Sequence, residues 1–235
     1  MAILRNVKRE VDAGLVAEKL VNSLSQPYQI KDEVITSITP SIGIALIPRD
    51  GLKVESIVKN ADIAMYEVKK SGKSGYKFFA PKMTEYSLRL LEIVNELKSV
   101  IENNAFNEQF NMHYQPILSS NGKINNFKII GIEALIRWNN PKLGKVSPAE
   151  FIPIAEESHL INEFNQWIIE RSIRDFKQIT KFHNNSLYLS INVSPQGLKT
   201  QTFSRSLQTA LLKNHLNPKS IQLEITETSL MEDDP

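Results

Sequence analysis

The chain has 235 residues, enough for a large core and for one or two domains, and its composition is ordinary for a soluble globular protein. A formal net charge of +2 gives no reason to expect a nucleic acid polymer as partner, and the absence of cysteine excludes a disulfide framework and a thiolate metal site. The sequence has no apolar run long enough for a membrane segment and no signal-peptide pattern at its start, so we expect a cytoplasmic location.

The first third of the chain alternates helical and strand patterns, which predicts a small α+β piece. In chain order we expect a helix over residues 9–24, a strand over 34–48, a helix over 54–72 and a short strand over 76–79. The apolar spacing of the first helix predicts a buried face made of Val11, Leu15, Leu20 and Leu24. Pro40 has no backbone donor, which favours an edge or a bulge at that point of the strand.

Residues 82–105 predict one long helix with an apolar seam. The seam residues recur at the 4-3-4 spacing that is typical of one helix packing along another, and they are Leu90, Val94, Leu97 and Ile101. Two partners fit this seam. The chain's own domain would make the segment a connecting helix, and a second copy of the chain would make a homodimer.

From His113 onward, strand patterns alternate with helical patterns. The predicted strands are HYQPIL at 113–118, GIEALIRW at 131–138, LYLSINVS at 187–194 and SIQLEITET at 220–228. Two helix starts are predicted among them, a capping box at Ser147, Pro148 and Glu150 and a second start at Ser194 and Pro195. Strands that alternate with helices indicate parallel βαβ units, and a (β/α) barrel fits this order better than an open doubly wound sheet.

Each of these strands has one apolar side and one side with polar residues. In GIEALIRW, Glu133 and Arg137 share one side, opposite Ala134, Ile136 and Trp138. We interpret the polar sides as pointing to a barrel axis, near the strand ends where barrel active sites lie. Glu133, Asn192 and Glu224 would then converge. An antiparallel sheet with one solvated face alternates in the same way and stays an alternative.

Two carboxylates and an amide oxygen suit a hard cation, Mg²⁺ or Mn²⁺, with Ca²⁺ as a third candidate. A cation would also offset the cost of burying the charge of Glu133. Arg137 shares the side of Glu133, and a guanidinium group matches phosphate by paired hydrogen bonds. Glu227 has the opposite parity to Glu224. It either orients a metal-binding side chain through a hydrogen bond or lies on a solvated strand end.

The motif EALIRW, with QPI upstream and INVSP and LEITET downstream, resembles the EAL family of cyclic di-GMP phosphodiesterases over about residues 85–235. The resemblance implies a TIM-like barrel that hydrolyses one phosphodiester of cyclic di-GMP to the linear dinucleotide, with Mg²⁺ or Mn²⁺. It implies metal ligation by Glu133, Asn192 and Glu224. It also implies catalytic roles for Glu133 and for Glu227, the latter as a supporting carboxylate. It also implies substrate contacts for Gln115 and Arg137.

PSIGIALIPRDG followed by NADIAMYEVKKSGKSGYKFF resembles the C-terminal part of a GGDEF (diguanylate cyclase) domain. We therefore expect residues 1–81 to form such a part, 82–105 to connect, and 106–235 to form the N-terminal half of an EAL-like barrel. Lys69 and Lys73 fall where the family has phosphate-facing basic residues, although Lys73 and Ser74 replace the usual arginine and asparagine. The GGDEF signature itself does not occur, so we expect no cyclase activity from this chain.

The EAL resemblance extends over the first four strands of a barrel. Asp233 and Asp234 follow the fourth strand without the surroundings of the family's paired aspartates, and we interpret them as a solvated loop. We therefore expect a truncated chain that needs a partner or further residues, with absent or very weak catalysis. Three functions remain open: a cyclic di-GMP phosphodiesterase in the parent architecture, a non-catalytic cyclic di-GMP-binding regulatory module, and a purely structural piece.

Overall fold

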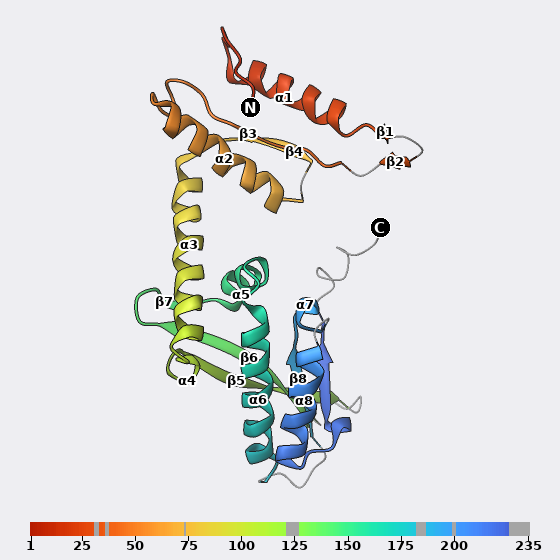
Figure 1. The fold of residues 1–235 in the computed structure, drawn as a ribbon. Coiled ribbons are helices and arrows are strands. Elements are labelled where there is room, and N and C mark those ends of the chain that lie inside the picture. Colours follow the sequence, from red (N-terminus) through yellow and green to blue (C-terminus); the bar gives the residue numbers. More distant parts are fainter. Residues whose placement is uncertain are drawn as a thin grey trace. The chain divides into compact units, whose positions relative to one another are not determined.

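The computed structural model describes residues 1–30, 33–35, 38–72, 74–120, 127–181, 187–198 and 201–225 (Figure 1). The chain divides into two compact units, Met1–Leu91 and Glu92–Pro235. Among the described residues, no helix is both long and apolar enough to cross a membrane.

The first unit is a small α+β assembly. Its elements are α1 (Glu10–Leu24), β1 (Tyr28–Ile30), β2 (Glu33–Ile35), β3 (Ser41–Ile44), α2 (Val54–Lys70), β4 (Gly75–Phe78) and the beginning of α3 (Pro81–Glu102). β1 pairs antiparallel with β2, whereas β3 and β4 are parallel and are joined through α2. α2 packs on one face of β3 and β4 at Gly43, and α1 packs on the other face, where Gly14 meets the ring of Tyr76.

Two expectations for this unit were wrong in detail. The segment 34–48 is not one strand, because β2 ends at Ile35 and β3 begins after Pro40, whose carbonyl accepts a hydrogen bond from the Gly75 amide. The apolar residues predicted for the buried face of α1 lie on its exposed side, with 62% of Val11 and 50% of Leu15 accessible. α1 instead buries small residues, because Tyr76 lies so close to Gly14 that only small side chains fit there.

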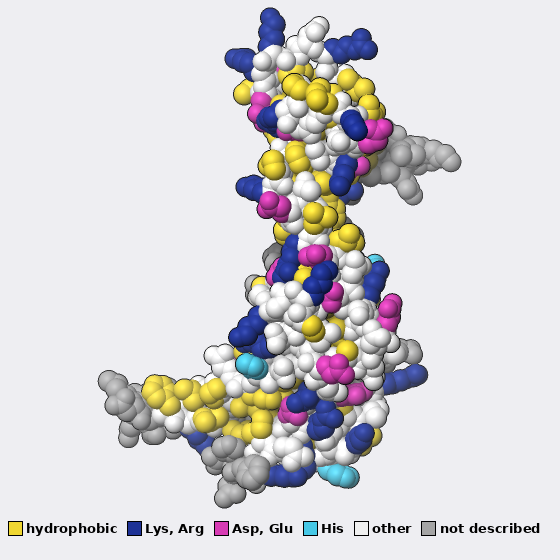
Figure 2. Space-filling view, turned by 90° about the vertical axis from the view of Figure 1, so that its left-hand side faces the viewer, with side chains coloured by type: hydrophobic (Ala, Val, Ile, Leu, Met, Phe, Trp, Pro, Cys, Tyr) yellow, Lys and Arg dark blue, Asp and Glu magenta, His cyan; other side chains and the backbone are white. Residues whose placement is uncertain are grey.

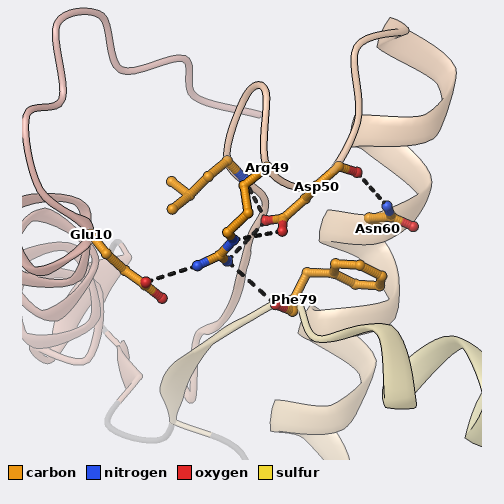
Figure 3. A network of polar contacts seen from close by, with 6 residues as sticks. Glu10, Arg49, Asp50, Asn60 and Phe79 are labelled. Atoms are coloured by element: carbon orange, nitrogen blue, oxygen red, sulfur yellow. Dashed lines mark hydrogen bonds and ion pairs between the residues drawn. The ribbon is translucent and has the colours of Figure 1, made fainter.

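A turn follows β3 at residues 47–50, and a polar network surrounds it (Figure 3). Asp50 accepts hydrogen bonds from the backbone amide of Leu46 at 2.7 Å and from the guanidinium group of Arg49 at 2.7 Å. Arg49 also donates to Glu10 at 2.8 Å, and the Asp50 carbonyl accepts from Asn60 at 2.7 Å. Hydrogen bonds to the carboxylates of Asp50 and Glu10 raise the pKa of Arg49. The turn therefore ties the start of α1 to α2.

The second unit is a mixed sheet with helices on one face (Figure 1). After α3 its elements are α4 (Phe106–Gln109), β5 (Phe110–Ser120), β6 (Phe127–Asn140), β7 (Gly144–Val146), α5 (Pro148–Glu157), α6 (Ile161–Thr180), β8 (Tyr188–Asn192), α7 (Pro195–Leu198), α8 (Gln201–Asn214), a 3-10 turn (Pro218–Ser220) and β9 (Ile221–Glu224). The strand order is β5-β6-β8-β9, and β7 pairs with β6.

Parallel pairing is confirmed for β6, β8 and β9, but it was wrong for β5, which runs antiparallel to β6. Residues 121–126 alone separate these two strands. A connection between parallel strands needs about a dozen residues or more. The connection between β5 and β6 is shorter than that, so it permits a hairpin and no crossover helix.

The helices of this unit begin close to their predicted positions. α5 starts at Pro148 after Ser147, yet the Ser147 side chain makes no capping hydrogen bond, so the predicted capping box is absent. The segment after Ser194 contains two helices, α7 and α8, where one was predicted. The part of α3 that belongs to this unit buries Ile93, Leu97 and Val100. Of the four apolar residues predicted to form a seam along α3, only Leu97 is buried.

Aromatic side chains form the core between the sheet and its helices. Phe110 of β5 stacks on Trp138 of β6 at 5.3 Å between ring centroids, and Phe151 of α5 meets Trp138 edge-on at 5.4 Å. Phe164 of α6 contacts Phe110 at 5.2 Å. The far end of the hairpin is less covered, since Leu118, Phe127 and Ile129 are exposed by 52%, 61% and 40%. Figure 2 shows one face of the surface, where hydrophobic side chains gather toward its lower left.

Candidate metal and substrate site

The two sides of β6 differ in burial as their sequence predicts. Ile132, Ala134 and Ile136 are buried, whereas Glu133 and Arg137 are half-buried on the other side. Trp138 shares the buried side and contacts Phe151 of α5. Glu133 therefore lies on the sheet face that α5 leaves uncovered, and the polar residues of β8 and β9 lie on this same face.

Strand register brings the three predicted metal ligands together on this face. Glu133 of β6 lies opposite Ser190 of β8, and Asn192 of β8 lies opposite Glu224 of β9. Asn192 Nδ2 donates a hydrogen bond to Glu133 Oε1 at 2.8 Å, and Ser190 Oγ donates to Glu224 Oε1 at 2.5 Å. The central strand β8 thus provides one donor to a carboxylate on each neighbouring strand.

The predicted substrate contacts lie on the same sheet. Gln115 of β5 is exposed and pairs directly with Glu133 across the hairpin. Arg137 is half-buried and donates from its guanidinium group to the carbonyl of Ile136 at 2.9 Å. Glu227, Lys73, Asp233 and Asp234 lie outside the described residues.

The oxygen atoms of this face fit a hard cation. Because Asn192 uses Nδ2 on Glu133, its carbonyl oxygen Oδ1 is the atom suited to a cation. Together with the carboxylates of Glu133 and Glu224, it gives three oxygen donors, about half of the octahedral shell that Mg²⁺ requires. In the described part of the chain, no group of three His, Cys, Asp or Glu side chains is placed to hold a metal ion.

A separate cavity of about 280 Å³ lies between α6, α7 and α8. Its lining includes Asn165, Gln166, Thr202 and Phe203, and none of the residues predicted for the site. The residues that line it include one carboxylate, Glu163, and no lysine, arginine or histidine. The strand face is therefore the better candidate for metal and phosphate chemistry.

Two residues of this face were not singled out from the sequence. Ser190 is fully buried and holds Glu224, and the ring of Tyr188 covers Gly131 so closely that a Cβ there would lie 2.8 Å from it. Both residues share the parity of Asn192 within the same strand. That shared parity was the available signal, but parity alone does not show which neighbour a side chain reaches.

The family model described as EAL domain matches residues 98–235, which is more than half of the chain. The chain belongs to the EAL family. A second model, described as diguanylate cyclase, GGDEF domain, matches residues 1–75. The EAL motifs therefore account for the second unit, and the GGDEF motifs for most of the first.

Relatives of this EAL-family chain include proteins whose names describe them as cyclic di-GMP phosphodiesterases. The bifunctional diguanylate cyclase/cyclic di-GMP phosphodiesterase MucR of Pseudomonas aeruginosa is 34% identical over 232 residues, which are 98% of this chain and 32% of MucR. The cyclic di-GMP phosphodiesterase PdeR of Escherichia coli is 32% identical over 222 residues, which are 93% of this chain and 32% of PdeR. The EAL-family chain thus spans about a third of the length of these relatives.

Solved structures of EAL domains share its fold. The P. aeruginosa MucR phosphodiesterase in complex with c-di-GMP superposes with a TM-score of 0.51 and 29% identity, over 60% of this chain and 54% of that one. The EAL enzyme Bd1971 with cAMP and cyclic di-GMP bound gives a TM-score of 0.54 and 26% identity, over 78% of this chain and 46% of that one. The fold of the EAL-family chain is therefore mixed α/β, a partial TIM-like barrel preceded by an α+β unit.

Proposed function

We propose that this chain contributes residues to a site that hydrolyses cyclic di-GMP to the linear dinucleotide with the help of Mg²⁺ or Mn²⁺. The observation that carries the proposal is the placement of Glu133, Asn192 and Glu224 on one face of three adjacent parallel strands, in a chain of the EAL family. The phosphodiesterase names of MucR and PdeR support the same chemistry. A cytoplasmic location, the domain bounds 1–81, 82–105 and 106–235, and a homodimer stay predictions from the sequence.

Each residue has a role that its surroundings support. Glu133 and Glu224 provide negative charge for the cation, and the hydrogen bond from Asn192 fixes the orientation of the Glu133 carboxylate. A bound divalent cation would polarise a phosphoryl oxygen and activate water. Glu227 is proposed as a supporting carboxylate.

Substrate binding is proposed for the neighbouring side chains. Arg137 carries a cationic fork suited to a phosphate group, and Gln115, exposed beside Glu133, offers amide groups to the nucleotide. These two residues do not depend on the cation for their own hydrogen bonds. They would therefore also serve a regulatory module that binds cyclic di-GMP without cleaving it.

The test measures cyclic di-GMP binding by calorimetry and turnover by chromatography, with Mg²⁺ and with Mn²⁺. We expect Arg137→Ala to weaken binding by about 10- to 100-fold, because a hydrogen-bonded ionic contact is lost. Glu133→Gln should weaken Mn²⁺ binding by at least about 10-fold and lower any metal-dependent turnover, since a metal ligand matters at least as much as the groups that orient it. Arg174→Ala and Glu163→Gln, which change exposed residues of α6, are the matched controls.

Two outcomes would change the proposal. Binding of cyclic di-GMP without any binding of Mg²⁺ or Mn²⁺ would favour the regulatory module. An Arg137→Ala variant that binds cyclic di-GMP as tightly as the unchanged chain would remove the proposed phosphate contact. A Glu133→Gln variant that binds Mn²⁺ as tightly as the unchanged chain would remove the proposed metal site.

A further inference from the structure

We propose that Ser190 is a positioning residue that orients the carboxylate of Glu224 for the cation. The inference rests on the proposed function, because it takes Glu224 as a metal ligand. The Ser190 side chain is completely buried in the central strand β8, and its hydroxyl group donates to Glu224 Oε1 at 2.5 Å. Family motifs point to Glu133, Asn192 and Glu224, and not to this serine.

The side-chain hydrogen bonds of β8 do not follow the pairing of residues between the strands. Ser190 lies opposite Glu133 but donates to Glu224, and Asn192 lies opposite Glu224 but donates to Glu133. Each carboxylate is therefore held by the residue that faces the other carboxylate. Both carboxylates are thus held by donors of the same central strand, one carboxylate from each neighbouring strand.

The hydroxyl of Ser190 also decides which oxygen of Glu224 remains for a cation. A serine hydroxyl has one proton to donate, and here Oε1 of Glu224 accepts it. Oε2 is then the oxygen of Glu224 that is suited to ligation. Removal of the Ser190 hydroxyl takes away the donor that holds Oε1, so the carboxylate of Glu224 loses its fixed orientation.

The experiment measures binding of Mn²⁺ alone to the full chain, from the loss of the free Mn²⁺ signal in electron paramagnetic resonance. Ser190→Ala should raise the Mn²⁺ dissociation constant by about 10- to 100-fold, the usual effect of removing a group that orients a metal ligand. Ser172→Ala is the matched control, because Ser172 is an equally buried serine that lies on α6. It should bind Mn²⁺ as the unchanged chain does, and Ser190→Thr, which keeps the hydroxyl, should restore most of the affinity.

The outcomes separate this inference from the proposed function. If Glu224→Gln weakens Mn²⁺ binding and Ser190→Ala does not, the role of Ser190 is overturned while the metal site stands. If neither the unchanged chain nor Glu224→Gln binds Mn²⁺, both proposals are overturned. Should Ser190→Ala fail to fold, Ser190→Cys replaces the hydroxyl with a weaker donor of similar shape and should weaken Mn²⁺ binding in the same direction.

Discussion

Polar side chains of the sheet fall into two sets on opposite faces. Glu133, Ser190 and Asn192 belong to the uncovered face, and Tyr114 belongs to the face that the helices cover. The Tyr114 hydroxyl donates to Asp175 Oδ2 of α6 at 3.0 Å, and Arg171 of the same helix donates to that oxygen at 2.8 Å. The helical face thus uses a polar contact for packing against α6, whereas on the other face Glu133 and Glu224 accept hydrogen bonds from β8.

Tyr114 gives a pH prediction. Burial, and then the charge of Asp175, raise the pKa of Tyr114, so its phenol keeps its proton in the folded chain at pH values where the unfolded chain, with an ordinary pKa of about 10, loses it. The stability that this proton contributes is therefore complete below about pH 10 and is lost as the pH rises above it. Tyr114→Phe should remove this part of the pH dependence and lower the unfolding free energy at pH 7 by about 1–2 kcal/mol.

Urea unfolding of the two proteins between neutral and strongly alkaline pH measures this difference. Any other group that titrates in this range contributes equally to both proteins. The curves for the unchanged chain and for Tyr114→Phe should therefore approach each other as the pH rises. Curves that stay parallel over the whole range would show that Tyr114 has no raised pKa.

Sequence parity was sufficient to predict that Glu133, Asn192 and Glu224 share a face, because a strand alternates its side chains without exception between two sides. Parity was not sufficient to predict the hydrogen bonds. Which donor meets which carboxylate depends on the register between strands, and register is a property of the assembled sheet. Ser190 was missed for this reason.

At the scale of elements, the strand β3 and the helix α2 approach each other as closely as backbones permit. A Cβ added at Gly43 of β3 would lie 1.9 Å from the Ala61 carbonyl oxygen and 2.3 Å from the Met65 amide nitrogen of α2. Both atoms belong to the helix backbone, which cannot move aside as a flexible side chain does. Glycine at this position therefore sets how closely α2 packs on β3.

Gly43→Ala should lower the stability of the first unit by about 3 kcal/mol or more, the upper part of the range for overpacking. Gly75→Ala is the matched control in the paired strand β4, because a Cβ there would meet only the side chain of Val68 at an ordinary 3.8 Å. Thermal unfolding followed by circular dichroism distinguishes the two variants. Equal melting temperatures for them would refute the close approach.

The sequence was sufficient to predict most elements as helix or strand. It was not sufficient to predict which face of each element packs against its neighbours. Helical spacing located α1, yet the face of α1 against the strands consists of small residues that a hydrophobic pattern ranks low. The spacing of β5 and β6 was visible too, but alternation of strands and helices led to the wrong parallel pairing. Both errors arise because packing depends on the partner surface, which is distant in the sequence.

At the scale of the molecule, the two units have separate cores. Both tryptophans of the chain, Trp138 and Trp167, belong to the second unit, where Phe110 contacts them at 5.3 and 6.1 Å. Tryptophan fluorescence therefore reports on the second unit, whereas circular dichroism reports on both. Domains with their own cores can unfold separately, so the two signals can be used to compare them.

Phe110→Ala should lower the stability of the second unit by about 3–5 kcal/mol, because a fully buried ring among aromatic neighbours is removed. In urea the tryptophan transition should shift to lower concentration, while the part of the circular dichroism signal that comes from the first unit keeps its midpoint. Phe127→Ala, which removes an exposed ring, should leave the tryptophan transition in place. Gly43→Ala should do the reverse of Phe110→Ala and shift circular dichroism alone. A common shift of both signals in both variants would mean that the chain unfolds as one cooperative unit and that the separate cores do not act separately.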